Sequence, residues 1–304
     1  MTDPPRHFDA IVLGGGAAGL MCAAVASHRG RRIALLEHNP QPGRKILISG
    51  GGRCNFTNLH CAPDRFLSGN PHFARSALAQ YEPRHFLELV ERYGIGWHEK
   101  TLGQLFCDHS SRQIVDMLLA ECEPAAGSRG SSPVEVILNA RNIVVEREGN
   151  LGFRVSSSAG EFRSAALVVA TGGLSIPKLG ATGLAYTLAR QFGLRVIEPR
   201  PALVPLVLGA DEARWTDLTG VSAEVIASAT SAPGRKAAAP AFREKMLITH
   251  RGLSGPAVLQ ASSYWRPGEA LQTSLRMTTF VVGCLKSKRS QPLRVTFHFL
   301  NSLY

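Results

Sequence analysis

The alternation of apolar and polar stretches is clearest near the start of the chain. Residues 8–13 are an apolar run of strand length, and the motif Gly14-x-Gly16-x-x-Gly19 follows it directly. An alanine-rich run to Gly30 then predicts a helix, and residues 32–36 predict a second strand that ends on Glu37. A strand, a glycine-rich turn, a helix and a second strand ending on an acid form the pattern of a βαβ dinucleotide-binding unit.

Each part of this unit has a physical role. Gly14 permits a tight turn from strand to helix, Gly16 lets the backbone approach a pyrophosphate, and Gly19 lets the helix pack close to the strand. The pyrophosphate is expected on the free N–H groups at the positive end of the helix dipole. Glu37 follows Gly19 by 18 residues and is placed to accept hydrogen bonds from a ribose diol. The predicted cofactor contacts in this unit are Gly14, Gly16, Ala17, Ala18, Gly19 and Glu37.

A second glycine cluster follows a turn-rich stretch that carries two cations, Arg44 and Lys45. Three consecutive glycines predict a mobile backbone with free N–H donors, suited to lie against a planar or anionic ligand. The alternative is a flexible surface loop without a ligand. The predicted contacts here are Arg44, Lys45, Ser49, Gly50, Gly51, Gly52, Arg53 and Asn55.

The middle of the chain predicts a series of shorter elements. Apolar periodicity indicates a helix over 72–93, a short strand or turn over 103–107, a helix over 114–122 and a strand over 134–138. Residues 124–133 are predicted to be a loop, and 143–163 a β-meander. His98, Asp108 and His109 are polar candidates, although singly placed histidines are more often structural or solvated than catalytic.

A wholly apolar strand over 166–169 is predicted to occupy a buried parallel position. It ends in Thr171, Gly172 and Gly173, which would place small residues and backbone amides near a cofactor at the carboxyl end of the sheet. A helix over 184–192 ends at Gly193. Two glycine-terminated apolar strands at this separation favour FAD over a simple NAD-dehydrogenase fold.

Composition changes near residue 196, where proline and alternating small and apolar residues predict a β-rich inserted domain. Thr249, His250 and Ser254 lie on a glycine-rich turn before a predicted helix, an arrangement that favours anions. His250 is the candidate for a substrate-side catalytic group, and a helix cap is the alternative role.

Three stretches together resemble a bacterial family of FAD-dependent oxidoreductases: Gly14–Leu20, Gly43–Asn55 and Thr57-Asn58. Its members are often labelled aminoacetone-oxidase-like or NAD(P)/FAD-dependent oxidoreductases, and a few are described as bile-acid dehydro-reductases. The resemblance implies a glutathione-reductase-type FAD domain with an inserted β-barrel-like domain. It also implies that Glu37 binds the adenosine ribose, that Arg44 and Lys45 lie along the cofactor, and that residues 49–55 line the flavin. The adenine is then expected near Asn142, between Arg141 and Ile143.

The resemblance runs from about Phe8 to about Leu271, whereas family members continue further. Residues 272–304 have little periodicity, no family motif and no Asp or Glu. We therefore hypothesise a frameshift or other truncation near residue 272, which sequencing of the locus tests. The predicted organisation is an incomplete FAD-binding domain over 1–195, the start of the inserted domain over 196–271, and an aberrant basic tail over 272–304.

Charge and cysteine content modify this prediction little. The net charge is +11, of which the five basic residues beyond position 269 supply +5 and the rest of the chain +6. No basic run elsewhere alternates with aromatics as nucleic-acid binding favours. The six scattered cysteines contain no C-x-x-C pair and suit reduced thiols in the cytoplasm. We expect no metal site, no membrane partner and no nucleic-acid partner.

The predicted fold class is α/β, a Rossmann-like FAD-binding domain with an inserted β-rich domain and a missing C-terminal part. The predicted function is an FAD-dependent oxidoreductase that transfers a hydride to or from flavin N5, acts on a small molecule, and has NAD(P)H as a candidate electron donor. Three alternatives stay open: an NAD(P)-binding protein without flavin, a non-catalytic dinucleotide-binding or nucleic-acid-associated protein, and an inactive fragment.

Overall fold

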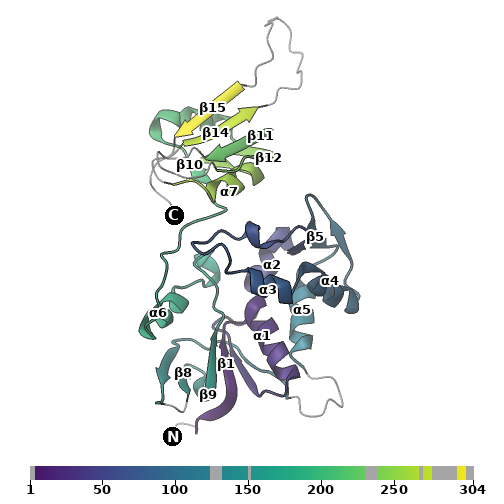
Figure 1. Ribbon diagram of the computed structural model, residues 1–304, viewed down its shortest axis with the longest axis vertical. Helices are drawn as coiled ribbons and strands as arrows, with labels where there is room; N and C mark the ends of the chain where they lie inside the picture. The colour runs from purple at the N-terminus through teal and green to yellow at the C-terminus, as the bar shows by residue number, and fades with distance from the viewer. Residues whose placement is uncertain are drawn as a thin grey trace, which may run out of the picture. The chain divides into compact units, whose positions relative to one another are not determined.

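The chain folds into two compact units, Met1–Val196 and Ile197–Tyr304 (Figure 1). The computed structural model describes residues 4–123, 132–149, 152–229, 239–266, 270–275 and 293–298. Most of the loop predicted over 124–133 lies outside these residues. In the described part of the chain, no helix combines the length and the apolar character that a bilayer crossing needs.

The first unit is built on a six-stranded sheet with the strand order β6-β2-β1-β9-β8-β7. Its strands are β1 (Arg6–Leu13), β2 (Ile33–Leu36), β6 (Glu135–Ile137), β7 (Val144–Arg147), β8 (Phe153–Ser157) and β9 (Gly160–Val169). β1 pairs in parallel with β2 and β9, β2 pairs in parallel with β6, and β7, β8 and β9 form an antiparallel meander. The predicted βαβ unit, strand 134–138 and meander are therefore confirmed.

The parallel strands bury side chains on both faces of the sheet, because successive side chains of a strand point to opposite faces. Val12 and Leu35 pack with α1 (Ala17–His28) and α5 (Arg112–Glu121) in one core cluster, and α1 and α5 lie beside each other in Figure 1. Ile11 and Leu13 pack on the other face with Val155 of the meander, and α6 (Leu184–Gln191) closes this second cluster. α6 confirms the helix predicted over 184–192, with Gly193 in the left-handed conformation after it.

β9 differs from the prediction in two ways. The segments expected as separate strands, 161–163 and 166–169, form one ten-residue strand. The predicted burial of its apolar end is wrong, because Val169 is 41% exposed. Pairing with β8 ends at Ser164, so among the described residues the end of β9 has a strand neighbour only on the β1 side.

Between β2 and β6 the chain forms a smaller layer around a three-stranded sheet of order β3-β5-β4. Its elements are α2 (Arg44–Ile48), the 3-10 turn η1 (Ser49–Gly52), β3 (Asn55–Asn58), η2 (Pro63–Arg65), α3 (Arg75–Gln80), α4 (Pro83–Arg92), β4 (Trp97–Glu99) and β5 (Gln104–Cys107). The single helix predicted over 72–93 is wrong. Pro83 starts a new helix because it lacks an N–H group and disfavours helical backbone in the residue before it, and Glu82 forms a capping box with His85.

The second unit is an antiparallel sheet of order β10-β13-β12-β11-β14-β15. Its elements are β10 (Leu206–Val207), η4 (Ala210–Leu218), β11 (Ser222–Ala229), β12 (Phe242–Thr249), β13 (Gly252–Ser254), α7 (Pro256–Ser262), β14 (Ala270–Leu275) and β15 (Leu293–His298). α7 packs on β11 and β12 around buried Val225, Leu253 and Val258. The stretch predicted as an aberrant tail, 272–304, thus supplies most of β14 and all of β15 to this sheet.

Candidate functional site

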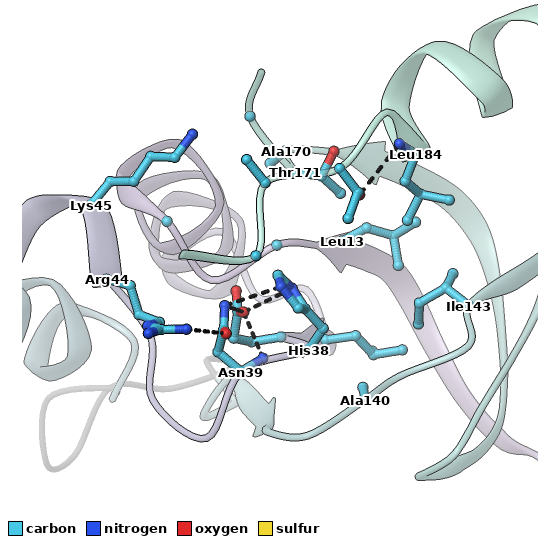
Figure 2. Close-up of a pocket in the computed structure, with 18 of the residues that line it drawn as sticks. Leu13, His38, Asn39, Arg44, Lys45, Ala140, Ile143, Ala170, Thr171 and Leu184 are labelled. Atoms are coloured by element: carbon cyan, nitrogen blue, oxygen red, sulfur yellow. Dashed lines mark hydrogen bonds and ion pairs between the residues drawn. The ribbon is translucent and has the colours of Figure 1, made fainter. Parts of the chain in front are cut away.

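A pocket of about 700 Å³ opens in the first unit at the carboxyl ends of β1, β2 and β9 (Figure 2). Its walls come from the turn after β1, the residues after β2, the start of α2, the turn before β7, the end of β9 and the start of α6. Ten predicted cofactor residues line it: Gly14, Gly16, Ala17, Ala18, Glu37, Arg44, Lys45, Asn142, Thr171 and Gly172. The carboxyl end of a parallel sheet is where this class of fold binds its ligands.

The three motif glycines differ in what surrounds them. Gly14 has a φ of +104°, and a Cβ there would lie 2.6 Å from the carbonyl oxygen of Ala170. A Cβ on Gly19 would lie 1.8 Å from the carbonyl oxygen of Gly14, so this glycine fixes the approach of α1 to the turn and does not line the pocket. A Cβ on Gly16 would meet nothing within 4 Å. Gly16 therefore leaves open space beside the first turn of α1, where backbone N–H groups attract anions.

The carboxylate of Glu37 is held in place from three sides, and its side chain is only 8% exposed. The backbone N–H of Gly15 donates to its Oε2 at 2.7 Å. The backbone N–H and side-chain amide of Asn39 both donate to its Oε1 at 2.8 Å, and Arg44 donates to Oδ1 of Asn39 at 2.7 Å. A carboxylate oxygen can accept two hydrogen bonds. Oε2 therefore has capacity for a ligand hydroxyl in addition to the bond from Gly15.

The two predicted cations join segments that are distant in sequence. The Arg44 guanidinium also contacts the carbonyl oxygen of Leu179 at 3.5 Å. Lys45 donates through Nζ to the carbonyl oxygen of Gly173 at 3.3 Å and to Oγ of Ser175 at 3.0 Å. Both side chains thus tie α2 to the segment after β9. This arrangement gives Arg44 a role in holding Asn39 that sequence spacing did not reveal.

Thr171 supplies a polar atom with no protein partner at the end of β9. Its hydroxyl oxygen is buried and makes no hydrogen bond in the described structure, and the residue lines the pocket. Buried polar groups in native proteins are nearly always paired, so an orphaned hydroxyl in a pocket wall is suited to a ligand. Together with the open space at Gly16 and the spare capacity of Glu37, it fits a dinucleotide.

The second glycine cluster does not line this pocket. The remaining predicted contacts, Ser49, Gly50, Gly51, Gly52, Arg53, Asn55 and Gly173, are absent from its described lining, as is Gly19. η1 follows α2 directly, however, and Lys45 of α2 is in the wall. In place of the expected open backbone, the segment is a 3-10 turn with Gly50 and Gly51 at φ +57° and +68°.

Neighbouring elements hold this turn by hydrogen bonds. The backbone N–H groups of Cys107 and Ser111 donate to the carbonyl oxygens of Arg53 and Gly52, at 2.9 and 2.7 Å. Phe106 packs so closely that a Cβ on Gly50 would lie 2.6 Å from its ring. The turn is therefore anchored to β5 and to the start of α5.

His250 lies in the second unit, exposed on the turn between β12 and β13. Oγ1 of Thr249 accepts hydrogen bonds from the N–H groups of Arg251 and Gly252 at 3.4 and 3.2 Å, so this hydroxyl stabilises the turn. α7 begins after Gly255 and has seven residues. The role predicted for His250 stays a prediction, and the pocket of the first unit is lined without it.

Sequence reasoning missed several pocket residues. His38 and Asn39 follow Glu37 directly, and Nδ1 of His38 lies 3.1 Å from its Oε1. Residues 180–184 and Thr187 line the pocket from the turn before α6 and from its first turns. The glycines of the Gly-Ala-Thr-Gly sequence at 180–183 were the available signal, but a turn before a helix is common and does not reveal which strand ends lie near it.

The buried thiols are poorly suited to chemistry. Burial raises the pKa of Cys107 and of Cys122 to about 11, and it also raises the pKa of Cys54. The five described cysteines are free. No group of three or more His, Cys, Asp or Glu side chains that could hold a metal ion occurs among the residues described.

Comparisons with known proteins agree with this geometry. The family model described as "HI0933-like protein Rossmann domain" matches residues 8–274. The chain is 48% identical over 271 residues to "Ribosomal RNA dihydrouridine synthase" of Escherichia coli (strain K12), covering 89% of this chain and 64% of that protein. The protein of the same name from Haemophilus influenzae is 43% identical over 273 residues, covering 89% of this chain and 65% of its own length.

A more distant relative is "3-dehydro-bile acid delta(4,6)-reductase" of Clostridium scindens, 29% identical over 259 residues, with 84% of this chain and 60% of that protein covered. Among solved structures, a flavocytochrome c3 fumarate reductase superposes with a TM-score of 0.45 at 18% identity, covering 73% of this chain and 48% of that chain. The chain spans less than two thirds of the length of each of these three curated relatives.

Proposed function

The chain belongs to the HI0933-like family of Rossmann-domain proteins, and we propose that it is an FAD-dependent oxidoreductase. The observation that carries the proposal is the buried, backbone-anchored carboxylate of Glu37 at one end of a pocket that also contains open space at Gly16. Dinucleotide-binding folds have an acid that accepts hydrogen bonds from the ribose hydroxyls about 20 residues after a glycine-rich turn that binds the pyrophosphate.

The residues that would hold FAD follow from the pocket. Glu37 would accept hydrogen bonds from the hydroxyl groups of the adenosine ribose, and the N–H groups of the first turn of α1 would bind the pyrophosphate. Thr171 offers its unpaired hydroxyl from the opposite wall, and the turn at Asn142 lies where the adenine is expected. When bound, the flavin supplies two-electron chemistry as hydride transfer at N5. NAD(P)H is the proposed electron donor.

Ribosomal RNA is the proposed substrate, specifically the uracil base of a uridine that becomes dihydrouridine. This step rests on the names of the two relatives at 48% and 43% identity. The sequence predicted a small-molecule substrate, and the charge distribution argued against nucleic acid, so an RNA assay tests both predictions. The cytoplasmic location also stays a prediction.

The absorption spectrum of the purified full chain, recorded with and without added FAD, tests the cofactor. We expect the near-ultraviolet and blue bands of oxidised flavin, and bleaching of these bands by NAD(P)H under anaerobic conditions. A folded chain that stays colourless in excess FAD contradicts the proposal and favours dinucleotide binding without flavin.

The substrate needs a second experiment. In vitro transcribed ribosomal RNA is incubated with the FAD-loaded chain and NAD(P)H, digested to nucleosides and analysed by mass spectrometry for dihydrouridine. Formation of dihydrouridine supports the RNA substrate. A flavin-containing chain that is reduced by NAD(P)H but leaves all uridine unchanged retains the oxidoreductase proposal and contradicts the RNA substrate.

A further inference from the structure

The small sheet beside the second glycine cluster carries an ordered histidine–carboxylate pair that the pocket does not use. Nδ1 of His98 on β4 lies 2.7 Å from Oδ1 of Asp108, just after β5. Their side chains are 40% and 41% exposed, so both groups remain reachable from solvent. From this geometry we infer that His98 is the proton donor to the substrate and that Asp108 is its positioning residue, an inference that rests on the proposed function.

The surrounding structure fixes the orientation of the imidazole. Its ring stacks on Phe106, with centroids 6.2 Å apart and planes inclined by 18°. Gly96 makes room for the carboxylate, because a Cβ there would lie 2.7 Å from Oδ2 of Asp108. With Nδ1 engaged by Asp108, Nε2 is the ring nitrogen available to a substrate. A carboxylate partner on one nitrogen fixes the tautomer and stabilises the imidazolium.

Strand pairing places His98 on the same face of the small sheet as Asn55, which follows the second glycine cluster. His98 pairs with Phe106, and Phe106 pairs with Asn55, so the three residues form one cross-strand row. The Phe106 ring reaches Gly50 at the start of η1. Beyond it, Cβ atoms on Gly51 and Gly52 would meet nothing within 4 Å. There is thus open space next to the turn that, by family resemblance, lines the flavin ring.

The chemistry requires one such group. Reduction of the uracil C5=C6 double bond adds two electrons and two hydrogens. A bound reduced flavin would supply the hydride for the new C–H bond at C6, and the pair of electrons displaced from the double bond would take a proton at C5. His98 delivers that proton from Nε2 and becomes a neutral imidazole, which solvent then protonates again. NAD(P)H supplies the two electrons for the next cycle.

Two charged side chains lie in this part of the small sheet. Asp108 bonds to the imidazole, and Nζ of Lys100 lies 5.2 Å from the Phe106 centroid.

Single-turnover kinetics on the FAD-loaded full chain test the inference. The chain is reduced anaerobically, mixed with transcribed ribosomal RNA, and assayed for dihydrouridine. His98→Gln is expected to slow product formation by about 10²- to 10⁴-fold, the usual contribution of general acid catalysis. Asp108→Asn is expected to slow it less. His72→Gln, an exposed histidine elsewhere in the first unit, is the matched control and should behave as wild type.

Two readouts separate this chemistry from a structural effect. The rate at which NAD(P)H bleaches the flavin is expected to stay at the wild-type value in all variants. The imidazole NMR signal that disappears in His98→Gln is expected to shift when uridine 5′-monophosphate is added to the wild-type chain. Product formation by His98→Gln at the wild-type rate overturns the inference alone. Absence of dihydrouridine with the wild-type chain overturns the proposed substrate and this role with it.

Discussion

The two glycine clusters of the first unit use the same residue for different physical reasons. In Gly14–Gly19, Gly14 and Gly19 are required for space, since a side chain on either would run into backbone atoms. In Gly50–Gly52, all three residues have positive φ, but Gly51 and Gly52 have no neighbour that a Cβ would meet. The first cluster therefore brings a helix onto a strand end and forms a pocket, whereas the second shapes a turn.

This difference has an energetic consequence. A side chain that overlaps a backbone oxygen forces main-chain atoms apart and disturbs the packing of the whole layer. A side chain at positive φ with open space around it meets only the local strain of the left-handed conformation, about 1–2 kcal/mol. Substitutions in the two clusters are therefore expected to differ in size and in which property they change.

Gly19→Ala should have the largest effect. Its Cβ would lie 1.8 Å from the carbonyl oxygen of Gly14, so we expect the free energy of unfolding to fall by about 3 kcal/mol or more. Urea denaturation followed by circular dichroism measures the change. A variant as stable as the wild type would show that α1 can move away from Gly14, and that close backbone contact is not why glycine is needed at position 19.

Glu37→Gln is expected to act on binding more than on stability. It replaces a charged acceptor by an amide, and the loss of hydrogen bonds to a charged group is worth about 1.5–3 kcal/mol, or roughly 10- to 100-fold in FAD affinity. Fluorescence titration with FAD measures it, and FMN, which lacks the adenosine, is the control ligand. Equal losses for FAD and FMN would contradict the role of Glu37 at the ribose.

Gly51→Ala is expected to cost about 1–2 kcal/mol of stability, because an alanine at φ +68° is strained. Gly51→Asn should recover part of this loss, since asparagine tolerates the left-handed conformation better than other side chains. Both variants should keep the wild-type affinity for ADP-ribose, because this ligand is expected to contact only the pocket at the ends of β1, β2 and β9. Thermal unfolding and calorimetric titration give the two numbers, and a loss of ADP-ribose binding would show that the clusters are coupled.

Gly16→Ala should change stability least, by about 1 kcal/mol or less, since alanine is a poorer N-cap residue than glycine but no side-chain cap bond is lost. Its φ of −83° suits alanine, and nothing lies within 4 Å of the new Cβ. The methyl group would, however, occupy the space assigned to the pyrophosphate. We therefore expect a nearly wild-type melting curve together with weakened FAD binding, and retained FAD affinity would place the pyrophosphate elsewhere.

Local patterns predicted much of the first unit, including β1, α1, β2, the meander and α6, because each is encoded in a short stretch. The break before Pro83 was also local, but the apolar periodicity continued across it and concealed it. The exposure of Val169 could not be read from its strand, because burial depends on which elements cover that strand. An apolar run shows that a strand has side chains to bury, but it does not show which elements pack against that strand.

The same limit applies to the site. Ten of the predicted cofactor residues line the pocket because they belong to motifs with fixed geometry. The hydrogen-bond chain from Arg44 through Asn39 to Glu37 was missed, since it depends on how the backbone turns after β2. The sequence also could not show that the Thr171 hydroxyl lacks a hydrogen-bond partner, because this depends on which atoms the fold brings next to it.

Lys45 has a consequence for how long a cofactor stays. Its ammonium group bonds to Gly173 and Ser175, and Lys45 and Gly172 both line the pocket. We expect this link to open before a cofactor bound at that end of the pocket can leave, so that exchange would be slow even where equilibrium affinity is modest.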